Sequence, residues 1–225
     1  MPSTIFPNYT FSRSLARYRN TATGRFVSRD RILDLLDAQI RHAENRLGDI
    51  VTAMHEKTIA PGVGQTLMRD ELRRLSLTNA ALGKGGFDRL DFRDYGRAGR
   101  QLRDTYQRVS NLARDLEAGR VSLPQALNRV AGYVGEARRS FFETEREALR
   151  STGKAYEERR RLNPAEHCRD CVRWASMSWR PMGELPAPGE QSACGSHCRC
   201  NMERREVTPE MMRERMTARL ERAMA

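Results

Sequence analysis

Residues 28–57, SRDRILDLLDAQIRHAENRLGDIVTAMHEK, decide the fold class. Apolar residues in this stretch recur every three or four positions, which places them along one face of a helix. They are Ile32, Leu36, Ile40, Ala43, Leu47, Ile50 or Val51, and Met54. The pattern predicts an amphipathic helix over about residues 29–57, and we therefore expect the body of the protein to be helical.

Three further segments show the same periodicity. The glycine-rich run 60–64 breaks the chain, and the apolar residues after it predict a second helix that ends before Gly83. A third helix is predicted over residues 91–118, with a glycine directly after it. The sequence SLPQ at residues 122–125 has the form of a capping box and predicts the start of a fourth, long helix. The charged stretch 157–161 is expected to end that helix before the next proline.

The two ends of the chain differ from this body. Residues 1–29 place aromatic residues among arginines without sustained periodicity, and we expect an extended basic and aromatic arm. Its aromatic residues could stack on nucleic acid bases, but we prefer docking of the arm on a neighbouring subunit. We expect a helical body over residues 30–163, a cysteine-rich zinc module over 164–205 and an amphipathic helix over 206–225. The predicted fold class is mainly α: an elongated helical body, a small irregular zinc-binding module with at most one short hairpin, and a C-terminal helix.

The composition limits the functional classes. A chain of 225 residues can bury a sizeable core without disulfides, and its apolar runs fall far short of the roughly 20 residues that cross a bilayer. The amino terminus lacks a basic segment followed by an apolar one, so we expect no secretory signal and a reducing cytoplasm. With 39% hydrophobic and 31% charged residues, the chain is polar for a compact enzyme, which disfavours a deep apolar active site.

The formal net charge is +11, and only three of the 40 basic residues are lysines. Guanidinium groups bind phosphates well, so a basic protein of this kind binds nucleic acid weakly and without sequence preference at low salt. Most of the arginines, however, alternate with Asp and Glu, as they do on a solvated helix face. We prefer this second interpretation of the charge.

All five cysteines lie between positions 168 and 200, and a Cys-x2-Cys pair followed by a second cysteine group is typical of a zinc site. The candidate ligands are Cys168, Cys171, Cys194, Cys198 and Cys200. We expect one structural Zn²⁺ ion. A structural site takes four donors, and this module offers the five thiols together with His167 and His197, so at least one donor is a spectator. Cys168 and Cys171 are the assigned pair, and the choice of two among the other three cysteines stays open.

We expect no catalytic site and no small-molecule substrate. A catalytic zinc keeps an open coordination position beside a general base, whereas a surplus of cysteines favours a closed site. The carboxylates nearest to the cysteines in sequence are Glu166, Asp170 and Glu190. The His-x-Glu sequence of zinc deaminases does not precede the cysteine pairs, and the glycine runs 62–66 and 83–86 lack the spacing of a phosphate loop. No catalytic or cofactor-binding residue is therefore assigned.

A set of motifs in the cysteine module carries a family resemblance. The motifs are Cys168-x2-Cys171, the sequence WRPMGELP over residues 179–186, and Cys194-x3-Cys198-Arg-Cys200. In this order they resemble the carboxy-terminal module of minor head, or head morphogenesis, proteins of tailed bacteriophages. Residues 18–28, YRNTATGRFVS, also resemble an arm motif that is frequent in phage structural proteins. Many relatives end in Cys-Arg-Cys after His-Pro, whereas Cys194 and His197 replace that arrangement here.

The resemblance implies a virion-assembly protein that is present in few copies. The partners that it implies are the portal protein, the major capsid protein or both, with non-specific contact with packaged DNA and no contact with a membrane. The implied location is the virion, in the capsid interior or portal region, after a period in the host cytoplasm. The alternative function is a zinc-containing DNA-binding regulator, and a third is a metal-dependent hydrolase that uses a carboxylate near the zinc.

Overall fold

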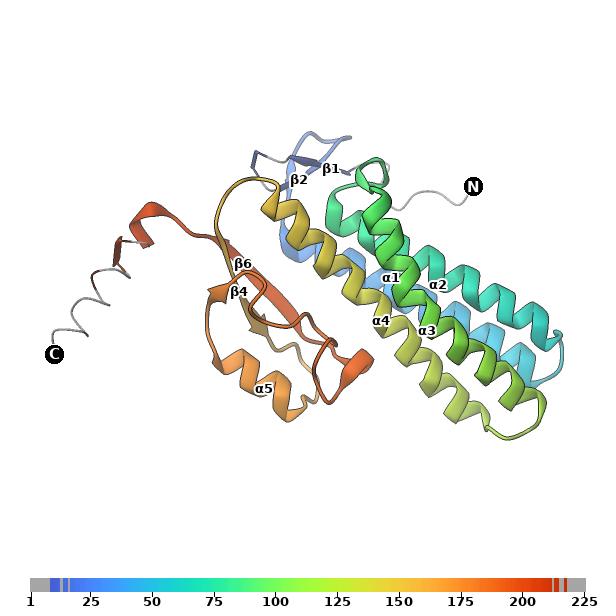
Figure 1. Cartoon of the computed structure of the whole chain (residues 1–225). Coiled ribbons are helices and arrows are strands. Elements are labelled where there is room, and N and C mark those ends of the chain that lie inside the picture. Colours follow the sequence, from blue (N-terminus) through green and yellow to red (C-terminus); the bar gives the residue numbers. More distant parts are fainter. Residues whose placement is uncertain (1–8, 13, 16, 212, 215–216, 218–225) are drawn as a thin grey trace.

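The structure is a computed structural model that describes residues 9–12, 14–15, 17–211, 213–214 and 217. Figure 1 shows a bundle of long helices beside a smaller part that contains a sheet, a short helix and irregular loops. A second small sheet lies against one end of the bundle. The mainly α fold class is confirmed, because a helical body precedes a largely irregular region that contains the cysteines.

Four antiparallel helices form the bundle. They are α1 (Arg29–His55), α2 (Pro61–Lys84), α3 (Phe92–Glu117) and α4 (Leu123–Arg150). Helix α2 contacts the other three, and α1 also packs against α4. The apolar faces predicted from the sequence meet in the core, where the largest fully buried side chains include Ile32, Leu36, Leu47, Met68, Leu72, Leu75, Leu82, Leu112, Phe141 and Phe142. Burial of one such side chain stabilises the fold by about 1.5–3 kcal/mol.

Capping residues fix where three of these helices begin. The Ser28 hydroxyl accepts a hydrogen bond of 3.2 Å from the backbone amide of Arg31 at the start of α1. The Asp91 carboxylate caps α3 in the same way. At α4 the Gln125 side chain accepts a hydrogen bond of 3.1 Å from the Ser122 amide, which confirms the predicted capping box. These contacts satisfy amide groups that lack a partner in the first turn of a helix.

Helix α2 is longer than predicted at both ends. It begins at Pro61, because proline fits the first turn, where its missing amide costs no hydrogen bond. It continues to Lys84 and ends at Gly85, whose φ of +97° lies in the left-handed region. Gly83 is therefore inside the helix. The residue is a glycine because α2 and α4 pack closely there, and a Cβ atom on Gly83 would overlap the carbonyl oxygen of Phe141.

The predicted end of the fourth helix is wrong. Helix α4 stops at Arg150, and Gly153 follows with a φ of +73°, a conformation that glycine adopts without strain. The charged residues that we expected at the helix end form strand β4 (Tyr156–Arg161) instead. Glu158 in this strand is fully buried and pairs with Arg146 at 2.7 Å. Buried ion pairs of this kind depend on the tertiary fold, so a charged sequence alone does not reveal the strand.

Strand β4 is the centre of a three-stranded antiparallel sheet. Along its length it pairs with β6 (Asn201–Glu206), with Tyr156 opposite Glu206, and it also pairs with the two-residue strand β5 (Arg180–Pro181). The short helix α5 (Arg169–Ser176) contacts β4. The sheet therefore crosses the expected boundary between helical body and module, because its central strand comes from the segment that we assigned to the body.

The N-terminal segment is folded, not extended, in the part that the structure describes. Strands β1 (Tyr9–Ser12), β2 (Arg17–Asn20) and β3 (Phe26–Val27) form an antiparallel sheet. The rings of Phe11 and Tyr18 are buried and pack edge to face with their centroids 5.1 Å apart. Two of the aromatic residues that we expected to dock on a neighbouring subunit are thus part of the chain's own core. Strands of two to four residues are too short for periodicity to identify.

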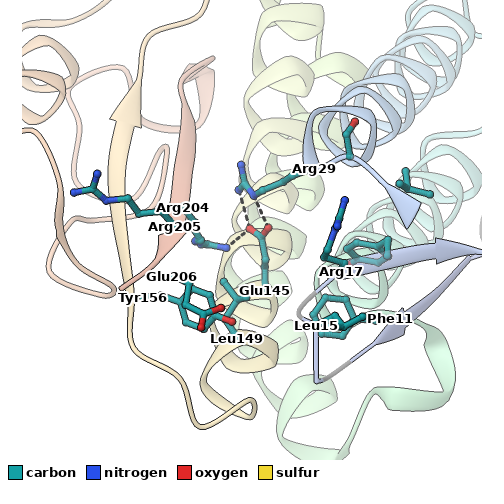
Figure 2. A pocket seen from close by; sticks show the side chains of 13 residues that line it. Phe11, Leu15, Arg17, Arg29, Glu145, Leu149, Tyr156, Arg204, Arg205 and Glu206 are labelled. Carbon is teal, nitrogen blue, oxygen red and sulfur yellow. Dashed lines mark hydrogen bonds and ion pairs between the residues drawn. The ribbon is translucent and has the colours of Figure 1, made fainter. Parts of the chain in front are cut away.

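A buried group of charges joins α1 and the C-terminal sheet to α4 (Figure 2). The Arg29 guanidinium donates hydrogen bonds of 2.7 and 2.9 Å to the Glu145 carboxylate, and Arg204 of β6 pairs with the same carboxylate. Burial alone would raise the pKa of Glu145, but the charges of Arg204 and Arg29 outweigh burial and lower this pKa. Burial lowers the pKa of Arg204 to about 10. These residues line a cavity of about 450 Å³ that the N-terminal sheet also borders.

No helix within the described ranges is long and apolar enough to cross a membrane. The C-terminal helix predicted over residues 206–225 does not start at Glu206, which belongs to β6, and the first helical residues are 209–211. Its proposed apolar stripe of Met212, Met216 and Leu220 lies outside the described residues.

Candidate metal centre

The five cysteines converge from the start of α5 and from the loop that precedes β6. Cys168 is the residue that caps α5, and Cys171 lies in its first turn, so both side chains are at the same end of the helix. Cys194 and Cys198 flank a single turn of 3₁₀-helix. Cys200 directly precedes β6, so the sheet positions the last cysteine.

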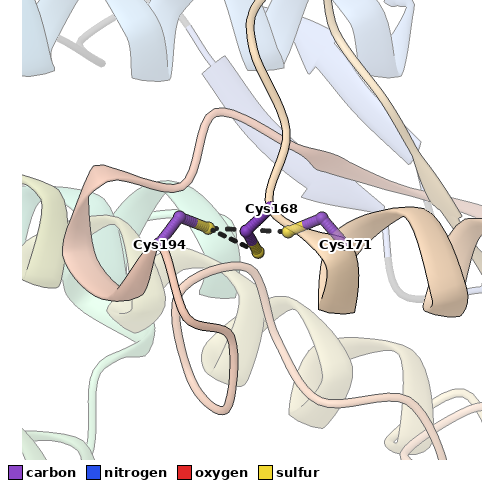
Figure 3. Close-up of side chains that lie close together, drawn as sticks. All are labelled: Cys168, Cys171 and Cys194. Atoms are coloured by element: carbon purple, nitrogen blue, oxygen red, sulfur yellow. Dashed lines mark hydrogen bonds between the residues drawn. The ribbon is translucent and has the colours of Figure 1, made fainter.

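Three of the sulfur atoms form a compact group (Figure 3), in which Cys168, Cys171 and Cys194 lie within 4.8 Å of one another. The Cys194 Sγ atom is 3.5 Å from Cys168 Sγ and 3.6 Å from Cys171 Sγ. In a tetrahedral site with metal–sulfur bonds of about 2.3 Å, neighbouring sulfur atoms lie about 3.8 Å apart. The observed distances are therefore compatible with sulfur ligands on one metal ion.

Cys171 also belongs to a second group, with Cys198 and Cys200, whose sulfur atoms again lie within 4.8 Å of one another. The Sγ atoms of Cys171 and Cys198 are 3.6 Å apart. Cys200 Sγ lies 3.6 Å from Nδ1 of His167, while the Nε2 atom of this histidine lies 2.7 Å from the carbonyl oxygen of Asn163. Since a carbonyl oxygen only accepts hydrogen bonds, Nε2 of His167 is the donor in this contact, and Nδ1 faces Cys200.

The second group is enclosed by protein. Cys171 and Cys200 are fully buried, and Cys198 is 5% exposed. The buried Arg160 places a guanidinium nitrogen 3.9 Å from Cys198 Sγ and lies over the Trp174 ring, 5.1 Å from its centroid. A guanidinium beside a sulfur atom stabilises the thiolate form, which is the form that binds metals.

The cysteines shift one another's pKa values in opposite directions. The hydrogen bond with Cys200 lowers the pKa of Cys198 to about 4 in spite of burial, and the charge of Arg160 adds to this shift. Burial raises the pKa of Cys171, and the hydrogen bond with Cys198 raises the pKa of Cys200. A divalent cation deprotonates each thiol that it binds. We therefore expect the cluster to release protons when it takes up a metal.

The structure places all five predicted cysteines in these two overlapping groups, and neither His167 nor His197 belongs to either group. Sequence spacing left open which of Cys194, Cys198 and Cys200 accompany the first pair. The structure brings all three next to Cys171, because the loop folds back over the start of α5. The cluster therefore offers more thiols than one tetrahedral ion uses.

Two residues that support the cluster were missed by the sequence analysis. Arg160 lies in the strand that we predicted as a helix end, and Asn163 lies in the loop after it, directly before the proline that we used as a helix stop. Neither residue carries a local signal, because a backbone carbonyl or a guanidinium contributes to a metal site only through tertiary contacts. The nearest sequence clue was the position of Asn163 four residues before His167.

Two of the three carboxylates near the cysteines hold loop backbone in place. The Asp170 carboxylate accepts a hydrogen bond of 2.9 Å from the Ala193 amide, and the Glu190 carboxylate accepts one of 2.8 Å from the Ala187 amide. Glu166 is exposed. These contacts order the loop between α5 and β6, which carries Cys194 and its neighbours.

The cysteine loop rests directly on α4. A Cβ atom at Gly135 would overlap the carbonyl oxygen of Ser196, and one at Gly132 would lie 3.2 Å from the Ser196 hydroxyl. Arg138 of α4 is buried and donates a hydrogen bond to the Asn201 side chain. The cluster is therefore fixed against the helical bundle by close backbone contact.

Comparison with known proteins does not assign the chain to a family. No protein-family model, no curated protein and no solved structure matches it.

Proposed function

We propose that the protein is a non-enzymatic phage head morphogenesis or minor capsid protein that acts near the portal or in the capsid interior. The observation that carries this proposal is the convergence of the five cysteines whose order resembles the module of phage head proteins. The helical bundle supplies long surfaces for contacts with other capsid proteins. The proposed partners are the portal protein, the major capsid protein or both.

In this proposal Zn²⁺ has a structural role. Thiolates with tetrahedral spacing are the ligands that structural zinc prefers. The loop over residues 177–200 places Leu185 and Ala187 in the hydrophobic core but contains few other large apolar residues, so a bound ion would add stability. The ion would hold this loop against α5 and, through Ser196, against Gly135 of α4.

The direct test is mass spectrometry of procapsids and mature virions of the phage whose genome carries this sequence. We expect the protein in both particles, in few copies, with chemical cross-links to the portal or the major capsid protein. Absence from both particles would overturn the assignment to phage heads.

A matched pair of variants tests whether the cysteine module is needed for incorporation. Cys171→Ser removes the sulfur that both groups share, while Val172→Ser changes the neighbouring residue, which is half exposed. We expect particles to lose the Cys171→Ser protein and to retain the Val172→Ser protein. Equal incorporation of the two variants would contradict a structural role of the module in assembly.

The net charge of +11 favours a second candidate, a zinc-containing DNA-binding regulator. A regulator binds one DNA sequence far more tightly than others, with affinity that falls steeply as salt rises. Binding to a random pool of DNA fragments, followed by sequencing at several salt concentrations, separates the two candidates. An enriched sequence supports the regulator, whereas weak binding without sequence preference excludes it.

A further inference from the structure

A cavity of about 450 Å³ lies where the N-terminal sheet meets α4 and the C-terminal sheet (Figure 2). Its volume is within the range of pockets that hold small organic ligands, about 300–1,000 Å³. Residues of β2, α1, α4 and β6 line it, so the cavity forms only when these distant segments fold together. No cysteine lines it, and the proposed function does not use it.

One wall of the cavity carries more positive than negative charge. The guanidinium groups of Arg29 and Arg204 share one carboxylate, that of Glu145, and both reach its Oε2 atom. The neighbouring Glu158 carboxylate is paired with Arg146 at 2.7 Å. Within this group three guanidiniums and two carboxylates leave one positive charge. The Arg204 side chain is only 3% exposed, so water does little to stabilise that charge.

The other charged groups that line the cavity are balanced by partners or by water. Glu206 pairs with Lys154 at 2.8 Å, and Arg205 pairs with Glu157 at 2.9 Å. The Arg17 side chain is exposed, so water stabilises its charge. The excess of one buried positive charge beside the cavity therefore remains.

An unpartnered hydroxyl lines the same cavity. The Tyr18 side chain is 7% exposed, and its hydroxyl oxygen has no hydrogen-bond partner within the part of the chain that the structure describes. Buried polar groups without a partner are costly, so the few that occur need an explanation. Burial and the charge of Glu145 raise the pKa of Tyr18, so this hydroxyl keeps its proton and can donate a hydrogen bond. A donor beside excess positive charge suits a bound anion.

Apolar side chains form much of the remaining wall. They are Phe11, Leu15, Val27, Leu149 and the ring of Tyr156. In Figure 2 the labelled side chains of Phe11, Leu15 and Leu149 lie below the ion pairs of Glu145. Leu15 is 53% exposed, so an apolar group in the cavity would cover surface that otherwise contacts water.

We propose that this cavity binds a small monocarboxylate with an apolar chain or ring. Its carboxylate would accept a hydrogen bond from the Tyr18 hydroxyl and supply the negative charge that Arg29 and Arg204 lack. One negative charge matches the buried excess, whereas a phosphate dianion would exceed it. The apolar part would lie against Leu15 and Leu149. The site binds a ligand without a reaction, and it depends neither on the phage assignment nor on a bound metal.

The test is isothermal titration calorimetry of the full-length chain with octanoate, octanol and acetate. Octanoate carries both the carboxylate and the apolar chain, octanol lacks the charge, and acetate lacks the chain. We expect one octanoate per chain, bound at least about tenfold more tightly than either of the others. Octanol or acetate binding as tightly as octanoate would overturn the proposal, and so would the absence of octanoate binding.

A tyrosine pair tests the recognition of the carboxylate. Tyr18→Phe removes only the hydroxyl and keeps the ring that packs against Phe11. Tyr95→Phe makes the same change on α3, where the side chain is 49% exposed and does not line the cavity. We expect Tyr18→Phe to weaken octanoate binding about tenfold and to leave octanol binding unchanged. Tyr95→Phe should match wild type, and equal octanoate affinity in the two variants would overturn the proposal.

A leucine pair tests the apolar wall. Leu15→Ala shortens a side chain of the cavity, while Leu67→Ala shortens one on α2 that is 43% exposed and lies outside the lining. We expect Leu15→Ala to weaken octanoate binding several-fold and Leu67→Ala to leave it unchanged. Octanoate affinity that is the same in both would mean that the ligand does not lie in this cavity. The measurements on virions and on metal content are independent of these titrations, so a failure of either inference is recognised separately.

Discussion

In the bundle of α1–α4 the largest fully buried side chains are all apolar, whereas in the part after α4 the fully buried residues include Glu158, Cys171 and Cys200 beside the apolar Met202 and Ala187. Apolar packing stabilises the bundle without any bound group. Charged and sulfur-containing groups in a small core stabilise a fold only when each has a partner. We therefore expect the bundle to stay folded when the cysteine module loses a metal ion or an ion-pair partner. This difference predicts separate responses to metal removal and to substitution of a core residue.

On the proposed structural zinc site, the largest expected effect is the loss of the cysteine module on metal removal. Structural zinc contributes an apparent binding free energy of about 10–16 kcal/mol in small zinc domains, far more than any single apolar contact here. A strong chelator, or Cys171→Ser, should abolish hydrogen-exchange protection in α5 and in the sheet of β4 and β6. Protection in α1–α4 should remain. Hydrogen exchange with mass spectrometry measures both regions in one sample, and undiminished protection of the sheet would contradict metal-dependent folding.

The second largest effect concerns the stability of the bundle alone. Phe141→Ala removes a fully buried ring from α4 and should lower the free energy of unfolding by about 3–5 kcal/mol. Phe92→Ala is the matched control, because its ring is 80% exposed, and its effect should stay within about 0.5 kcal/mol. Urea unfolding followed by circular dichroism measures both. Similar losses in the two variants would show that the core is not built around Phe141.

A third substitution tests the contact between the two regions. Gly135→Ala places a Cβ atom against the Ser196 carbonyl and should destabilise the protein by about 1–3 kcal/mol, because backbone must move. Gly99→Ala in α3 is the control, since no atom lies within 4 Å of the added Cβ, and it should stabilise by up to about 1 kcal/mol. Thermal unfolding compares the two. A neutral Gly135→Ala would mean that the cysteine loop does not rest on α4.

The smallest effect is a pH dependence that arises at Glu145. Its pKa is lowered in the folded protein by Arg204 and Arg29 against the effect of burial, so the unfolded chain binds the proton more readily. The resulting stability is present above the ordinary pKa of 4.5 and is lost as pH falls through the folded value. Thermal unfolding between pH 6 and about pH 3 should show a shallower decline for Glu145→Gln than for wild type. Asp34→Asn, whose carboxylate is exposed, should follow the wild-type slope.

Local sequence patterns were sufficient to predict much of the bundle. The helix predicted over residues 29–57 is observed as Arg29–His55, and the one predicted over 91–118 is observed as Phe92–Glu117. In both, an apolar stripe and a capping residue lie within the same segment, so the information is local. The strand at residues 156–161 could not be predicted, because its burial depends on arginines elsewhere in the chain, such as Arg146 and Arg204.

The sequence by itself determined the amphipathic helices, the capping box at Ser122 and the candidate metal ligands, because periodicity, capping and Cys-x2-Cys spacing act over a few residues. The tertiary structure alone decided that the N-terminal aromatics enter the core and that β4 joins β6. It also placed Cys171 between two groups of sulfur atoms and turned His167 towards Cys200. These features depend on contacts between distant segments, and such contacts form only when the bundle brings the segments together.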